Sequence, residues 1–154
     1  MTPAILTNYF FVGARLREHL ATIPELAAEG AVQLVENLTE QGIQRAPTDT
    51  TAFVSWDGDI FPTGDEAKRA GGGRQQSFQQ VWTVILAVRD ASQTVDLVAR
   101  NAKAGKLLGA IQMLLGGWKP SGAVTPLQRA AGRKPSYPPN AGLYPLTFQI
   151  QLFL

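Results

Sequence analysis

Only a few residues of this chain have the types and spacing that chemistry requires. His19 is the single histidine, and its neighbours Arg17 and Glu18 place it on the polar side of a predicted helix, where a solvated role is expected. Asp57-Gly58-Asp59 resembles the start of a calcium loop, but the later ligands of such a loop, including its final bidentate Glu, are missing. Gly71-Gly72-Gly73-Arg74 lacks the Gly-Lys-Ser/Thr ending of a phosphate loop and precedes a strand instead of a helix. We therefore predict no catalytic, cofactor or metal site.

Charge is distributed unevenly along the sequence. Residues 97–154 carry seven cations and no acid, whereas residues 1–96 carry the other seven cations and all twelve acids. The two parts therefore have net charges of +7 and −5, within a total of +2. Such polarity predicts an oligomer subunit that presents one sign of charge to a neighbour or a lumen and the other sign elsewhere.

Three of the later cations, Arg100, Lys103 and Lys106, are spaced three residues apart, which places them on one sector of a predicted helix. One interpretation is a solvated outer face, and the other is a surface that faces phosphates or an acidic neighbour. Nothing resembles a helix-turn-helix, a zinc finger or an aromatic platform for RNA, so sequence-specific recognition of nucleic acid is not expected. Transient contact with DNA of any sequence stays open.

The composition fits one cytoplasmic domain that hides surface against partners. A chain of 154 residues can bury a single core, and we predict one domain over residues 1–154. Charged residues make up 17%, below the usual value of about 25%, as expected for a subunit with covered surfaces. The absence of Cys excludes disulfides, thiolate nucleophiles and Cys-ligated metals. No signal-peptide pattern is apparent, and no apolar run approaches the roughly 18 residues of a membrane span.

Hydrophobic periodicity predicts helices mixed with strands. The predicted helices cover residues 3–21 and 94–115, and the second ends at the Gly116-Gly117 exit before Pro120. Residues 51–56, 76–89 and 146–154 alternate with the period of two that is typical of a sheet with one covered face. Residues 31–38 fit either a strand or a helix, and we prefer a strand. The expected fold class is α/β (α+β), with a mostly antiparallel sheet flanked by an N-terminal helix and a long second helix.

Several side chains receive specific roles from these patterns. Ala52, Val54 and Trp56 are expected to share the covered face of their strand, and Trp118 to pack back over the end of the second helix. The small residues Ala102, Gly105 and Gly109 permit close approach of another backbone to that helix. The buried stripe of the helix is expected at the following residues: Leu97, Ala104, Leu108, Ile111 and Leu115.

Two long segments, residues 57–75 and 119–142, are rich in Gly and Pro and contain few apolar anchors. Loops beyond about 12–15 residues in a compact domain are usually functional or disordered. We predict that both are assembly arms, which become ordered on contact with neighbouring subunits.

The order of these elements resembles that of tailed-phage tail terminator proteins, also called tail completion proteins. The resemblance lies in the strand VWTVILAVR at residues 81–89, the helix around Asn101-Ala102-Lys103-Ala104-Gly105 and the corner LLGGWKP at residues 114–120. The loop containing Pro126-Leu127 and the alternating final strand also match. The resemblance covers most of the chain and consists of layout and short signatures.

This resemblance implies an α/β subunit of a virion protein that forms a ring, usually a hexamer, assembled in the host cytoplasm. Such a ring caps the finished tail tube, stops its polymerisation and provides the surface that joins the tail to the head. The implied partners are further copies of the chain, the tail tube protein, a head–tail connector or neck protein, the sheath in contractile tails, and DNA in transit. The family has no catalytic residues to transfer. Candidate interface or lumen residues are the following cations: Arg74, Arg100, Lys103, Lys106, Arg129, Arg133 and Lys134.

Two other interpretations remain at this point. One is a different neck component, such as a head-closure or connector subunit with similar loops. The other is a non-viral adaptor that binds nucleic acid or an acidic partner through its basic C-terminal half.

Overall fold

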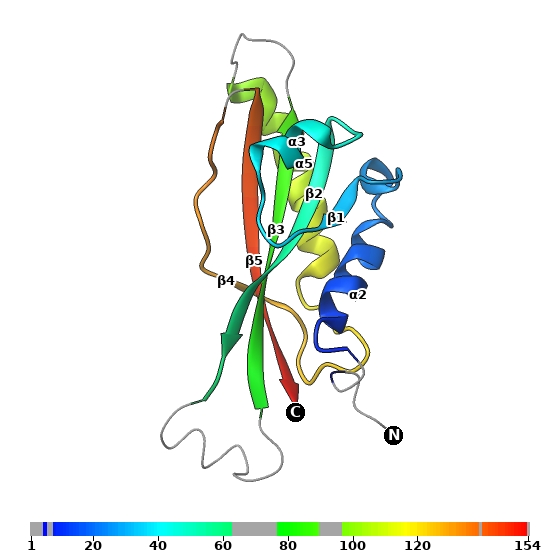
Figure 1. The fold of residues 1–154 in the computed structure, drawn as a ribbon, viewed down its shortest axis with the longest axis vertical. Helices are drawn as coiled ribbons and strands as arrows, with labels where there is room; N and C mark the ends of the chain where they lie inside the picture. Colours follow the sequence, from blue (N-terminus) through cyan, green and yellow to red (C-terminus); the bar gives the residue numbers. More distant parts are fainter. Residues whose placement is uncertain (1–4, 6–7, 63–76, 90–96, 139, 154) are drawn as a thin grey trace.

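The chain folds around one five-stranded mixed sheet, with the strand order β1-β2-β3-β5-β4 (Figure 1). The computed structural model describes residue 5 and residues 8–62, 77–89, 97–138 and 140–153. Its elements are, in chain order, α2 (Phe11–Leu20), η1 (Pro24–Leu26), β1 (Val32–Leu34), α3 (Glu40–Arg45), β2 (Thr50–Ile60), β3 (Ser77–Arg89), α5 (Leu97–Leu115), β4 (Gln128–Ala130) and β5 (Ala141–Phe153). The expected α+β class with a mostly antiparallel sheet is confirmed.

Strand β3 is the centre of the sheet, because β2 and β5 both pair with it along nearly its whole length. Both pairings are antiparallel, whereas the short edge strand β1 runs parallel to the first half of β2. The β2–β3 register shifts at a bulge between Trp56 and Gly58. At the other edge, β4 pairs with three residues of β5.

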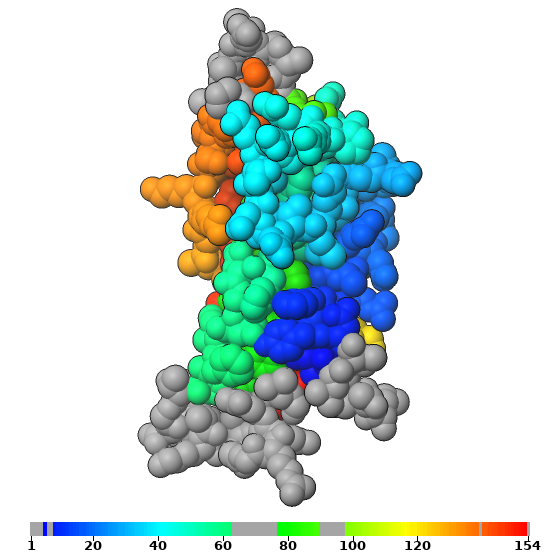
Figure 2. All heavy atoms as spheres, in the orientation of Figure 1, coloured from blue at the N-terminus to red at the C-terminus, as the bar shows by residue number. Residues whose placement is uncertain are grey.

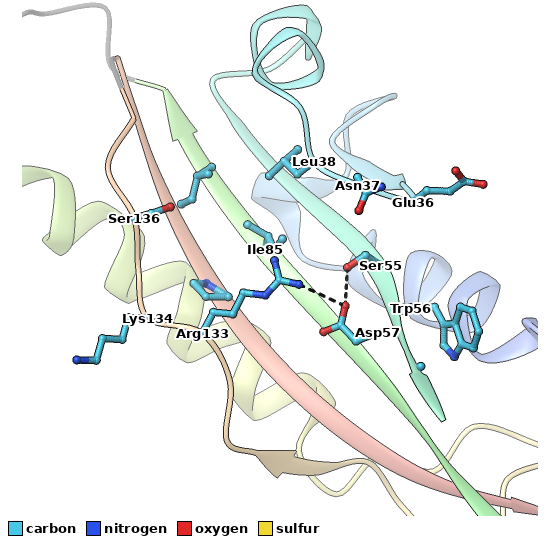
Figure 3. A pocket seen from close by; sticks show the side chains of 13 residues that line it. Glu36, Asn37, Leu38, Ser55, Trp56, Asp57, Ile85, Arg133, Lys134 and Ser136 are labelled. Atoms are coloured by element: carbon cyan, nitrogen blue, oxygen red, sulfur yellow. Dashed lines mark hydrogen bonds and ion pairs between the residues drawn. The ribbon is translucent and has the colours of Figure 1, made fainter. Parts of the chain in front are cut away.

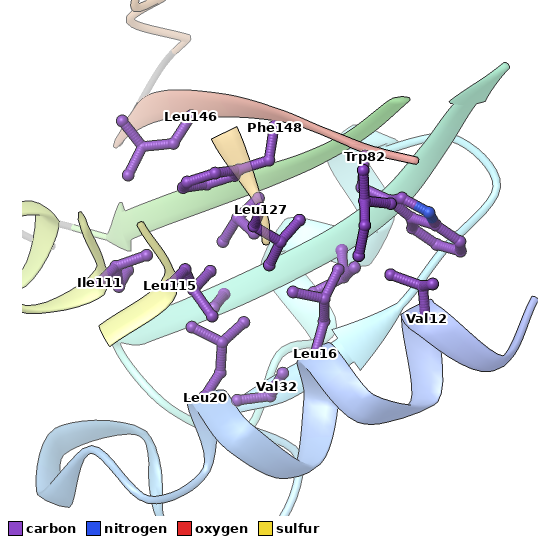
Figure 4. Close-up of a cluster of buried hydrophobic side chains, with 14 of the residues drawn as sticks. Val12, Leu16, Leu20, Val32, Trp82, Ile111, Leu115, Leu127, Leu146 and Phe148 are labelled. Atoms are coloured by element: carbon purple, nitrogen blue, oxygen red, sulfur yellow. The ribbon is translucent and has the colours of Figure 1, made fainter. Parts of the chain in front are cut away.

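Helices α2 and α5 cover the same face of the sheet and enclose the main core with it (Figure 4). The predicted faces of β3 and β5 are confirmed, because their alternate residues from Phe78 to Val88 and from Leu146 to Leu152 point into this core. The helices contribute their apolar stripes to the same cluster, including Leu16 and Leu20 from α2 and Ile111 and Leu115 from α5 (Figure 4). Leu108, which we had placed on the stripe, is only partly buried, and Leu107 is buried in its place.

The opposite face of the sheet is also covered at one end, contrary to the expectation of one covered face. A second cluster consists of Ala46, Phe53, Ile85 and Ala87, with Val35, Leu38 and Leu143 packed against it. The chain that follows β1 and the short helix α3 brings several of these side chains together. Thr39 caps α3, because its Oγ1 accepts a hydrogen bond from Gly42 N at 3.0 Å. We did not predict this helix from the sequence.

The first helix is shorter than predicted. Its described part, α2, begins at Phe11 after a turn in which Asn8 Oδ1 accepts a hydrogen bond from Phe10 N at 3.0 Å. This local side-chain bond competes with helical pairing, so the continuous helix over 3–21 is wrong at Asn8 to Phe10. The preference for a strand in residues 31–38 is confirmed only for β1.

The first predicted arm, residues 57–75, begins with four residues that belong to strand β2. Residues 57–60 continue β2 beyond the bulge and pair with β3, so they are not a loop. Trp56 pairs with the core-facing Trp82 and lines the same hollow as Val54, so its predicted face is correct, but it is 41% exposed because β1 ends at Leu34 and leaves this part of β2 uncovered. Residues 63–76, with the Gly71-Gly72-Gly73-Arg74 segment, lie outside the described residues, as does the predicted start of the second helix at residues 94–96.

The second predicted arm is part of the folded body. Gly117, at φ 80°, donates its N–H to Leu127 O at 3.0 Å, and Leu127 N donates to Trp118 O at 2.9 Å. Leu127 itself is 1% exposed in the main core. Trp118 packs back over the helix end as predicted and stacks on His19, with ring centroids 4.1 Å apart. His19 therefore helps to join α2 to this corner and is not simply a solvated residue.

Candidate assembly surfaces

A hollow of about 600 Å³ crosses the sheet on the face opposite α2 and α5 (Figure 3). Its floor includes side chains of the central strands, such as Ile85, and residues 36–38 after β1 form one wall (Figure 3). The other wall is a strap, residues 131–137, which leaves β4 and returns to β5 through reciprocal hydrogen bonds between Ser136 and Leu143. We call this hollow the charged groove because Glu36, Asp57, Arg133 and Lys134 all line it.

Among the charged side chains of this groove, Asp57 has contacts with three other residues. It lies in the β2 bulge, and its carboxylate accepts hydrogen bonds from the hydroxyls of Thr83 and, at 3.4 Å, Ser55. Arg133 approaches the same carboxylate at 4.0 Å, but its side chain is 75% exposed. An exposed pair at that distance contributes little free energy, so the hydroxyl bonds hold Asp57 and the strap cation remains available.

A second hollow, of about 530 Å³, lies where β1 ends while β2 continues. It is lined by Phe10, Gly13, Leu34, Val35, Glu36, Val54, Trp56 and Trp82, and we call it the apolar groove. Figure 2 shows the start of α2 lying against the second half of β2 on the face toward the reader. The rings of Phe10 and Trp56 meet edge to face on its rim, with centroids 5.1 Å apart. Large apolar side chains gathered on one surface indicate a contact site for another molecule.

The rim of the apolar groove is fixed by a polar cluster below it. Trp56 Nε1 donates to Asp59 Oδ1 at 3.1 Å, and the Tyr9 hydroxyl donates to the other oxygen of the same carboxylate. Burial, followed by this hydrogen bond and the nearby negative charge, raises the pKa of Tyr9 to about 12. The tyrosine therefore remains a neutral donor to Asp59 at physiological pH.

The predicted basic sector of α5 does not exist as one exposed surface. Arg100 is only 6% exposed, its Nη1 lies 3.5 Å from Ala141 O, and its side chain packs close to Gly142. Lys103 and Lys106 are exposed, but they line a hollow of about 480 Å³ together with Glu25 and Asp49.

The remaining candidate cations lie on the side of β4 and the strap. Arg129 donates to Gln112 Oε1 at 2.9 Å and lies 5.7 Å above the ring of Phe148. Arg133 and Lys134 line the charged groove, whereas Arg74 lies outside the described residues. Acids from the first part of the sequence and cations from the second therefore share grooves, and the predicted separation of charge does not hold for these surfaces.

Sequence reasoning missed the apolar groove. Phe10 was placed within the continuous helix over 3–21 and Trp56 on the covered face of its strand, because the hydrophobic period alone reveals neither the turn before α2 nor the early end of β1. No signal in the sequence marks where β1 ends before β2 does.

The described part of the chain shows neither a metal-binding cluster nor a membrane-spanning helix. Its His, Cys, Asp and Glu side chains form no group of three or more that could hold a metal ion. None of its helices has the length and apolar character needed to cross a membrane.

Comparison with known protein families identifies the class. The model of the phage tail terminator protein family matches residues 6–154, which is nearly the whole chain. The chain belongs to the phage tail terminator protein family. Membership implies a structural role in the phage tail, a location in the virion tail and interaction with other tail components. A search of curated proteins finds no match.

Membership of this family also removes one of the earlier interpretations, the non-viral adaptor. A phage tail protein is a structural virion component, so the non-viral adaptor is no longer needed to explain the basic residues. Within this family, the two grooves and the strap are candidate contacts with copies of the chain and with other tail proteins.

Proposed function

We propose that this protein forms a ring, a hexamer, on the end of the finished tail tube. The ring ends polymerisation of the tube and provides the surface to which the head is joined. The observation that carries this proposal is the family match over residues 6–154, since it spans every described strand and helix. We take the whole chain, as one domain, to be the ring subunit.

The surfaces of the subunit support a ring. A ring requires heterologous contacts, in which two different surfaces of each subunit meet. The charged groove and the apolar groove differ in chemistry, although they adjoin at Glu36 and Trp56, which line both. Either is able to accept a neighbouring copy, and the other stays available for the tube protein or a neck protein.

The remaining partners follow from position in the virion. In the proposed ring, one face contacts the tail tube protein and the other contacts the head–tail connector or neck protein. In contractile tails the rim also meets the last sheath ring. DNA passes through the bore during ejection, and exposed cations such as Arg133 and Lys134 provide transient contact with any sequence. Assembly takes place in the host cytoplasm.

Native mass spectrometry of the protein, alone and with its tail tube protein, tests this proposal. We expect a hexamer in at least one of the two conditions. A monomer that persists in both would rule the ring out.

Electron microscopy of particles assembled without the protein separates a terminator from a head-closure subunit. Loss of a terminator should give tails of irregular length that remain unattached to heads. Tails of normal length beside heads that have lost their DNA would instead indicate head closure.

A further inference from the structure

The outer face of α5 is unusual for a helix on the surface of a subunit. The inner face buries Ala104, Leu107, Ile111 and Leu115 in the main core. The opposite side, which we call the outer face, consists of Ala102, Gly105, Gly109 and Met113. All four are exposed, and Met113 is 84% exposed. A helix at the surface normally turns charged and polar residues outward, and a helix that is apolar on both sides is normally covered on both.

The two glycines make this face shallow. A Cβ added at Gly105 or Gly109 would meet nothing within 4 Å, so neither glycine is needed for packing inside the subunit. Glycine inside a helix costs about 1 kcal/mol relative to alanine. Their presence is explained if another surface lies directly against the α5 backbone.

The apolar groove has the complementary properties. It is concave and apolar, and the exposed side chains of Phe10, Leu34 and Trp56 surround it. The small residues at positions 102, 105 and 109 let the side chains of the groove rim approach the α5 backbone, and Met113 supplies one large exposed apolar side chain to enter the groove.

The charges of the two surfaces are also complementary. The exposed acid Glu36 lines the apolar groove, and the exposed cation Lys106 lies beside the outer face of α5. In Figure 1, α5 passes behind the sheet, whereas Figure 2 shows the start of α2 and the second half of β2 toward the reader. The two surfaces are formed by different elements of the subunit, so a contact between them joins two different surfaces of neighbouring copies.

From these observations we infer that the outer face of α5 in one copy docks into the apolar groove of the next copy. The contact is heterologous, and its repetition around an axis closes the ring. This inference rests on the ring of the proposed function and assigns the two surfaces that build it.

Cross-linking tests the contact directly, because the chain contains no cysteine. Leu34→Cys places a thiol in the apolar groove and Met113→Cys places one on the outer face of α5, both at exposed positions. With a short bis-maleimide, the double variant should give a covalent ladder up to the size of the ring. An equimolar mixture of the two single variants should stop at dimers, and each single variant alone should remain uncross-linked. Leu34→Cys combined with Lys119→Cys is the matched control, expected to give no ladder.

Other results would overturn the inference in distinct ways. A ring of full mass by native mass spectrometry without a ladder would exclude this contact and leave the proposed function intact. Cross-linking of Met113→Cys alone would show that α5 pairs with α5, and cross-linking only to added tube protein would assign the groove to the tube. If no ring forms in any condition, the proposed function and this contact fail together.

An assembly measurement gives an independent readout. Gly109→Leu should raise the concentration for half-maximal ring formation at least tenfold, because the larger side chain holds the neighbouring surface away from α5. Lys119→Gln should leave that concentration unchanged. An unchanged value for Gly109→Leu would contradict the docking of this face.

Discussion

Replacing Gly13 with Ala tests how tightly α2 packs on the sheet. A Cβ at this position would lie 2.7 Å and 2.8 Å from Cη2 and Cζ3 of Trp82, and 3.2 Å from Cδ2 of Leu34. Trp82 cannot move away easily, because it is buried and its Nε1 donates to Gln80 Oε1 at 3.0 Å. Gln80 Nε2 in turn donates to Tyr9 O at 3.0 Å, which ties the indole to the start of α2.

Two effects of opposite sign determine how much Gly13→Ala changes the free energy of unfolding. Extra volume in a packed site costs about 1–3 kcal/mol. Alanine in place of glycine inside a helix recovers up to about 1 kcal/mol. We therefore expect Gly13→Ala to lower the free energy of unfolding by about 1 kcal/mol, and by up to about 2 kcal/mol if the indole has no room to tilt.

The matched control is the same substitution in α5. At Gly105 the added methyl group meets nothing, so Gly105→Ala should raise the free energy of unfolding by up to about 1 kcal/mol. Urea unfolding at a concentration where the chain is monomeric measures both, and each kcal/mol should shift the melting temperature by about 2–4 °C in a chain of this size. If Gly13→Ala proves as stable as Gly105→Ala, the reasoning from Cβ contacts is refuted.

Three further outcomes are expected. Trp118→Ala should lower the free energy of unfolding by about 2 kcal/mol. A double-mutant cycle with His19→Ala should show a coupling energy of about 0.5–1.5 kcal/mol, because the two rings stack. If the effects of the two substitutions are additive, the stacking is contradicted. Leu127→Ala should lower the free energy of unfolding by about 2–5 kcal/mol in the same urea assay, because the Leu127 side chain is fully buried. A decrease of less than about 1 kcal/mol would instead support the prediction that residues 119–142 become ordered only on assembly. The raised pKa of Tyr9, about 12, implies stability that is fully present below pH 10 and is lost as the pH rises toward 12, since the unfolded chain loses this proton first. Tyr9→Phe should flatten the decline in stability over that window, and an unchanged slope would show that Tyr9 titrates normally.

The parts of the fold that could be predicted are those in which the local hydrophobic periodicity alone determines the secondary structure and the buried face. The alternation in β3 and β5 identified the strands and the residues that face the helix layer, although Ile85 and Ala87 of β3 are also buried, on the opposite face. In β2 the same rule predicted one covered face, but α3 and the residues before it also cover Phe53 from the other side. A six-residue helix gives too short a pattern to be recognised.

The candidate sites were harder to predict because they depend on three-dimensional placement. Residues at spacing i, i+3 and i+6 span about 120° around a helix with 3.6 residues per turn. A sector of that width extends from the exposed side of α5 at Lys106 to its buried side at Arg100. Likewise, sequence order separates Asp57 from Arg133, whereas the strap brings them to the same groove. Only the family resemblance, which used the whole layout, led to the tail terminator class.

The central position of β3 also has a consequence for folding kinetics. Its second partner, β5, is distant in sequence, and the hydroxyl contact between Thr83 and Thr147 spans 64 residues. Contacts of such separation form late, so a β2–β3 hairpin is expected to precede the docking of β5. During that interval β3 exposes an edge in which residues 81–88 contain no charge, glycine or proline. Segments of this composition pair readily with copies of themselves, so the subunit is most prone to aggregate before β5 closes the edge, and slower synthesis at lower temperature should increase its soluble yield.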